Sequence, residues 1–199
     1  MNKIEFTDRE FQIIQDQEFL LTKSTALSKI DDLLSKVRSE LKLAIKDYSI
    51  MHPAFSKFKT SKISRGENYR GLPYLVLDYP AVFSAEDSFA FRTMFWWGNF
   101  FSCTLHLQGK PLDLYRDLVI DNIGHLVNHD IFLCINQSPW EYHYEVDNYK
   151  LLSVDDLDFI KESQFLKLSK KFKLSSWKSL PSEANRFLIQ LLDIFNRLS

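Results

Sequence analysis

The sequence predicts an α+β protein with N-terminal helices, a central and mainly antiparallel sheet, and further helices packed on that sheet. Three observations lead to this fold class. Apolar residues recur every three or four positions as far as about residue 50, alternate with polar residues between 61 and 108, and return to helical spacing after residue 180. Helical and strand patterns in separate parts of a chain are typical of α+β folds.

The N-terminal segment carries the pattern of a helix start. Thr7 and Glu10 have the spacing of a capping box, which predicts a first helix over about residues 8–21. Ser24 is then expected to cap a second, longer helix. That helix is expected to end at His52-Pro53, because the residue before a proline avoids helical backbone angles.

The middle of the chain is expected to form two β-hairpins. Strands are predicted at 62–65, 72–79, 89–97 and 100–108. The loop GENYRG, residues 66–71, joins the first pair. Gly98-Asn99 joins the second pair as a two-residue turn with glycine first, which would place Trp97 opposite Phe100 in a 97–100 hairpin.

The second half of the chain predicts a mixture of short helices and strands. The expected elements are a helix at 111–127, a strand at 131–135, an alternating strand at 140–146, a short helix capped by Ser153, a strand at 165–174, and a final helix opened by Pro181. No internal repeat or linker-like composition divides the chain, so residues 1–199 are expected to form one α+β domain.

Composition argues against several classes of function. The formal net charge is -1, so no basic surplus predicts nucleic-acid binding. The chain lacks an apolar leader and an apolar run of spanning length, which predicts a soluble cytoplasmic protein with no membrane association. His125 and His129 stand four residues apart but lack the glutamate of a zinc motif, and no cofactor or metal is expected.

The predicted turn assigns the second hairpin's side chains to two faces. Arg92 falls on one face among apolar residues, while Phe91, Phe95, Trp97 and His106 fall on the other. Neither face shows the charged row of a sheet open to water. Helices of the same chain, a second copy of the protein as in a homodimer, or a ligand could each cover the aromatic face.

Arg92 is the sharpest single observation on this hairpin. A guanidinium among apolar strand neighbours needs a partner, because an unpaired buried charge costs several kcal/mol. Asp78 on the preceding strand is the natural one. A structural pair between these two residues and a ligand-binding arginine are both open.

Two further segments could carry chemistry. Arg65, Glu67, Tyr69 and Arg70 are concentrated around the GENYRG loop, where two arginines could hold an anion or the glutamate could pair internally. The segment EYHYEVD, residues 141–147, surrounds a histidine with three carboxylates. Such a group can serve acid–base or metal chemistry, or can form a charge ladder with lysines of the strand at 165–174.

Two functions follow as expectations. The first is a domain that binds a small anionic or aromatic ligand, or a protein partner, through the aromatic sheet face and the arginine-rich loop. Its candidate residues are Arg65, Glu67, Tyr69, Arg70, Asp78, Arg92, Trp97 and His106. The second is an enzyme acting on a small anionic substrate, with the three arginines binding the anion and Glu67 or His106 acting as acid or base.

Overall fold

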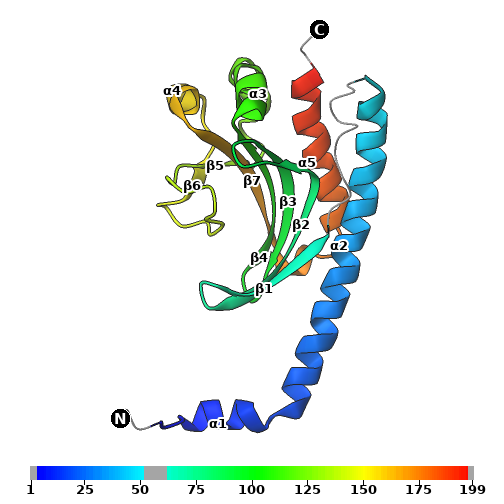
Figure 1. The fold of residues 1–199 in the computed structure, drawn as a ribbon, viewed down its shortest axis with the longest axis vertical. Coiled ribbons are helices and arrows are strands. Elements are labelled where there is room, and N and C mark those ends of the chain that lie inside the picture. The colour runs from blue at the N-terminus through cyan, green and yellow to red at the C-terminus, as the bar shows by residue number, and fades with distance from the viewer. Residues whose placement is uncertain (1–3, 52–61, 197–199) are drawn as a thin grey trace.

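A computed structural model describes residues 4–51 and 62–196 and confirms the α+β fold (Figure 1). The helices are α1 (Asp8–Gln15), α2 (Gln17–Met51), α3 (Lys110–Asp121), α4 (Leu157–Glu162) and α5 (Leu180–Phe195). The strands are β1 (Ile63–Tyr69), β2 (Leu72–Phe83), β3 (Ser88–Trp96), β4 (Phe100–Gln108), β5 (Phe132–Cys134), β6 (Tyr149–Leu151) and β7 (Phe165–Lys173). Short 3₁₀ turns lie between some of these elements.

All seven strands belong to one antiparallel sheet in the order β1-β2-β3-β4-β7-β5-β6. Helices α2 and α5 cover one face of this sheet, here called the helix face (Figure 1). Residues 135–148, which connect β5 to β6, lie against the opposite face. We call this segment the β5–β6 loop and the sheet surface beneath it the loop face.

The turn between β3 and β4 has three residues, so the predicted register is wrong by one position. Trp96 pairs with Phe100, and residues 97–99 form the turn, in which the glycine has a φ of 70°. Three-residue hairpin loops that contain a residue in the left-handed conformation are common. The sequence Trp97-Gly98-Asn99 is compatible with such a loop as well as with a two-residue turn. A shift of one residue moves every β4 side chain to the other face. Arg92 therefore lies opposite Thr104, on the loop face.

Phe91 and Phe95 belong to the main hydrophobic core on the helix face. The ring of Phe91 lies 5.8 Å from that of Phe187 in α5. Of the three coverings that the sequence left open for these rings, the structure shows helices of the same chain. The ring density of this hairpin is therefore mostly core packing, which stabilises the sheet by removing apolar surface from water.

The break between the first two helices lies at Asp16 rather than near residue 22. The predicted capping box at the start of α1 is present. The Asp16 carboxylate accepts a hydrogen bond from the backbone N–H of Phe19 at 2.8 Å, which starts α2 there, and Ser24 lies inside that helix. The predicted stop at His52-Pro53 lies outside the described residues.

In the second half of the chain the helix-start signals are confirmed, whereas one helix end and the strand predicted at 140–146 are wrong. The capping box at Ser153 is present, and Pro181 lies in the first turn of α5. Helix α3 ends at Asp121 instead of 127, because the Asn122 side chain bonds the carbonyl of Leu118 and the chain continues as a 3₁₀ turn. In the described parts of the chain, no helix combines the length and apolarity that crossing a bilayer requires.

Candidate functional site

A pocket of about 390 Å³ lies between the loop face and the β5–β6 loop, and we call it the Arg92 pocket. Strands β2 and β3 form its floor, and the β5–β6 loop forms one wall. Its lining residues are Ser64, Arg65, Tyr69, Tyr74, Val76, Asp78, Arg92, Met94, Trp140 and Tyr142. Pockets of a few hundred Å³ with many rings and a few polar groups are typical small-molecule sites.

Arg92 and Asp78 form the polar centre of the floor, which confirms the predicted pair. They are register partners on β3 and β2, and two parallel hydrogen bonds of 2.7 and 2.8 Å join Nε and Nη2 to the two carboxylate oxygens. The side chains are only 17% and 19% exposed. Burial is the largest single influence and opposes the charge of Arg92, but the hydrogen bonds to Asp78 together with the charge interactions with Tyr142 and Asp78 outweigh it, and the pKa of Arg92 is raised. The remaining Nη1 donates to the hydroxyl of Tyr142.

The segment predicted as a strand at 140–146 is part of the β5–β6 loop, so that prediction is wrong. Side chains rather than a neighbouring strand satisfy its backbone. The Tyr69 hydroxyl accepts hydrogen bonds from the N–H groups of Tyr142 at 2.7 Å and His143 at 3.0 Å, and donates to the Glu141 carboxylate at 3.0 Å. The alternating pattern arises because Tyr142 and Tyr144 turn toward the sheet, where they contact Arg92 and β7.

Lys167 of β7 also holds the β5–β6 loop in place, from the sheet side. Its side chain is almost fully buried, and Nζ donates to the carbonyls of Pro139 at 2.8 Å and Glu141 at 2.7 Å. The ammonium lies 4.4 Å from the centre of the Tyr142 ring. Burial lowers the pKa of Lys167 to about 8. The predicted charge ladder is wrong for this lysine, because it binds backbone carbonyls instead of the carboxylates of the loop.

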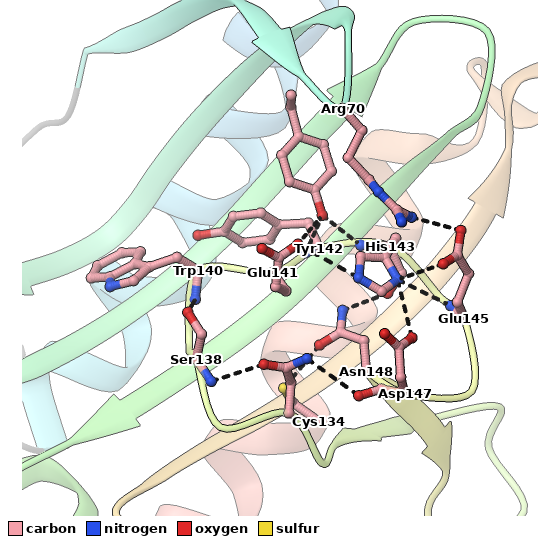
Figure 2. A network of polar contacts seen from close by, with 12 residues as sticks. Arg70, Cys134, Ser138, Trp140, Glu141, Tyr142, His143, Glu145, Asp147 and Asn148 are labelled. Atoms are coloured by element: carbon pink, nitrogen blue, oxygen red, sulfur yellow. Dashed lines mark hydrogen bonds and ion pairs between the residues drawn. The ribbon is translucent and has the colours of Figure 1, made fainter.

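The histidine and carboxylates of the loop gather in a network that Figure 2 shows. His143 lies with Glu145 and Asp147 so that one ligand atom of each is within 4.8 Å of the others, a spacing at which such groups could hold a metal ion. Arg70 already engages Glu145 at 2.6 Å, and this hydrogen bond lowers the pKa of Glu145. The arrangement is that of a charge network that ties the loop to the β1–β2 turn.

His106 lies beside the pocket rather than in it. A second cavity, of about 10 Å³, is lined by His106 and Lys167 together with Arg92 and Tyr142, which also line the Arg92 pocket. His106 is 5% exposed, and its Nε2 has no hydrogen-bond partner among the described residues. Burial, assisted by the charges of Lys167 and Arg92, lowers the pKa of His106 to about 4, so the imidazole is neutral near pH 7.

Of the four residues predicted around the GENYRG loop, Arg65 and Tyr69 line the Arg92 pocket, whereas Glu67 and Arg70 do not. Strand β1 continues through most of that segment, and only Arg70 and Gly71, both with positive φ, form the turn. Arg65 lines the Arg92 pocket and pairs with Asp31 of α2 at 2.8 Å. Glu67 is exposed and lies 3.5 Å from Lys23 of α2. Arg70 is taken up by the network at Glu145.

Trp97 lies away from the Arg92 pocket, in a separate groove against α2. Sequence reasoning also missed four residues that shape the site: Tyr74, Trp140, Tyr142 and Lys167. Only the first had a signal, because Tyr74 alternates with Val76 and Asp78 along β2. The ring of Tyr74 lies across Gly66 of β1, where a Cβ atom would come within 2.3 Å of it.

Comparison of the chain with protein-family models, with curated proteins and with solved structures gives no match. The protein is therefore classified by its structure alone. It has an antiparallel sheet with helices on one face and, on the other face, a pocket lined by aromatic rings and containing an arginine.

Proposed function

We propose that the protein is a binding module that takes a small anionic ligand bearing a ring in the Arg92 pocket. The observation that carries this proposal is the meeting of two arginines and four aromatic side chains around one space. These residues are Arg65, Arg92, Tyr69, Tyr74, Trp140 and Tyr142. They come from the β1–β2 hairpin, β3 and the β5–β6 loop, so the fold rather than local sequence brings them together.

The electrostatics of the site favour an anion. Asp78 balances Arg92. Lys167 adds a positive charge 4.4 Å from the centre of the Tyr142 ring, and its own hydrogen bonds go to carbonyls. The Tyr142 hydroxyl accepts from Arg92, and burial raises its pKa to about 12, so it keeps its proton at neutral pH. That proton is suited to a ligand carboxylate or phosphate, because hydrogen bonds to charged acceptors are the strong ones.

The rings favour a flat or apolar body on the ligand. Trp140 stands at the rim with 55% of its surface exposed, whereas Tyr69 and Tyr142 pack edge to face deeper in the site. An indole left open beside a pocket can stack on a ligand ring, and such aromatic contacts contribute about 0.5–1.5 kcal/mol. We therefore expect the anionic group near Arg92 and the ring near Trp140.

Binding is favoured over the enzymatic alternative because the proposed acid–base groups are poorly placed for that chemistry. A general acid or base works best with a pKa near the working pH and within reach of the substrate. His106 is neutral, buried and in the neighbouring cavity, and its pKa is about 4. Glu67 is exposed next to Lys23 and does not line the pocket.

The proposal predicts selective binding of benzoate, which combines a ring and a carboxylate, over acetate and phenol, which each carry one of the two. Nuclear magnetic resonance titration of the full chain should shift the indole N–H signal of Trp140. Trp140→Ala should weaken benzoate binding roughly 3- to 10-fold, the loss expected for one aromatic contact.

Trp177→Ala is the matched control, since Trp177 is also about half exposed but lies in the groove against α2. It should leave benzoate binding unchanged. Equal affinities for acetate and benzoate, or a Trp140→Ala variant that binds as well as the parent chain, would contradict the proposed site.

A further inference from the structure

Helix α1 and the first turns of α2 expose several large apolar side chains. None of the residues of α1 is buried. The exposed apolar side chains of α1 and the first turns of α2 are Phe11, Ile13, Ile14, Phe19, Leu20 and Leu21. We call residues 8–21 the arm. Figure 1 shows the arm extending beyond the sheet, with α1 turned sideways at its end. Large apolar side chains that are exposed close together in the chain are typical of an interaction site.

A largely apolar groove of about 680 Å³ on the same molecule could receive such a helix. It runs between α2 and the β3–β4 turn, and we call it the α2 groove. Its apolar lining includes Ala26, Ile30 and Leu33 of α2, Phe95 and Trp97 beside the turn, and Trp177. Lys29 and Lys36 stand exposed among the α2 residues that line it, with Asp32 between them.

The arm cannot fill the groove of its own chain. Only Asp16 separates α1 from α2, and its side chain is bonded to the N–H of Phe19 in the first turn of α2. Two helices that fold back on one another need a connection of about two to five residues. Bringing α1 against its own groove would therefore require unwinding the start of α2.

We propose that α1 of one copy docks in the α2 groove of a second copy, and that the exchange is reciprocal, giving a two-fold dimer. Each chain carries both halves of the contact, and reciprocal use of both closes the assembly. The two surfaces carry opposite net charges. Helix α1 with its end residue is acidic, with Asp8, Glu10 and Asp16 against Arg9. The α2 groove is basic, with Lys29 and Lys36 against Asp32. This inference is independent of the Arg92 pocket.

The dimensions allow this exchange. Ala26, the first groove residue, lies nine positions after Gln17, which is about 14 Å along the helix. An antiparallel crossing of two α2 helices near Thr22 brings the partner copy's α1 level with the groove. The same crossing covers part of the apolar surface that Phe19, Leu20 and Leu21 expose in both copies.

Light scattering coupled to size-exclusion chromatography of the full chain tests the proposal. The parent chain should have twice the chain mass of 23.5 kDa. An arm variant with Phe11→Asp and Ile14→Asp, and a groove variant with Ala26→Glu and Lys29→Glu, should each have the mass of one chain. Val146→Asp, a charge placed at a fully exposed apolar residue of the β5–β6 loop, is the matched control and should stay dimeric.

Mixing the two monomeric variants distinguishes arm-to-groove docking from other contacts. The arm variant keeps an intact groove and the groove variant keeps an intact arm, so one of the two contacts can form and a 1:1 mixture should show a heterodimer. Circular dichroism would verify that both variants are folded. A monomeric parent chain at about 100 µM, an arm variant that stays dimeric, or a mixture that stays monomeric would each overturn the proposal.

Discussion

Replacing Asp78 with alanine is expected to lower the free energy of unfolding by about 2 to 4 kcal/mol. Breaking a buried pair costs about 3 to 5 kcal/mol, and we reduce this range because both side chains keep slight exposure. The loss arises because Arg92 keeps its charge under all ordinary conditions and would stay beneath the β5–β6 loop without its carboxylate. Thermal unfolding should show a fall of roughly 5 to 12 °C.

Arg92→Met should cost less than Asp78→Ala, since a stranded carboxylate can take up a proton whereas a stranded guanidinium cannot lose one. The double variant Asp78→Leu, Arg92→Met should recover much of the loss, because removing both charges of a buried pair is often nearly neutral. If Asp78→Ala and Arg92→Met both unfold like the parent chain, the pair is not the buried centre of the floor described above.

The second large effect is expected on acidification and comes from His106. Its folded pKa is about 4 and its ordinary value is 6.5, so between these pH values the unfolded chain takes up a proton that the folded chain excludes. Folding stability should therefore decrease with falling pH. The contribution of the neutral imidazole is present above pH 6.5 and is lost as the pH falls toward 4. The loss should be about 2 to 3 kcal/mol across this range.

Chemical denaturation of the parent chain and of His106→Gln between pH 7 and pH 4 measures this contribution. The glutamine variant lacks the titrating group, so its stability should fall less over the range, while the carboxylates shared by both proteins cancel in the comparison. His125→Gln, at an exposed histidine, should follow the parent chain. Parallel curves for the parent chain and His106→Gln would show that His106 is not held neutral by burial.

Local signals in the sequence located most elements of the fold, because they depend on neighbours in the chain. The capping boxes at Thr7 and Ser153 and the proline opening α5 act within one helical turn, and all three are present. The break at Asp16 was missed because Ser24 offers an equally good cap, and only one of the two is used. Hairpin register failed for a similar reason: a three-residue turn satisfies Trp97-Gly98-Asn99 as well as a two-residue one.

The site was predictable only where it rests on regular strands. The pairing of Arg92 with Asp78 survived the register error, since it depends on β2 and β3 and not on β4. Trp140, Tyr142 and Lys167 could not be found in this way. Trp140 and Tyr142 lie on the β5–β6 loop, whose backbone is held by side chains distant in sequence, such as Tyr69. Lys167 lies on the regular strand β7, but its part in the site comes from its bonds to carbonyls of that loop.

Crystallographic soaking with a mixed set of small fragments tests the central claim, the ligand site, most directly. The set would include neutral rings, anions without rings, and rings bearing a carboxylate or phosphate. We predict that the ring-bearing anions gather in the Arg92 pocket, with the anionic group beside Arg92 and Tyr142 and the ring against Trp140. An Arg92 pocket that stays empty while the same fragments occupy the α2 groove or other surfaces would contradict it.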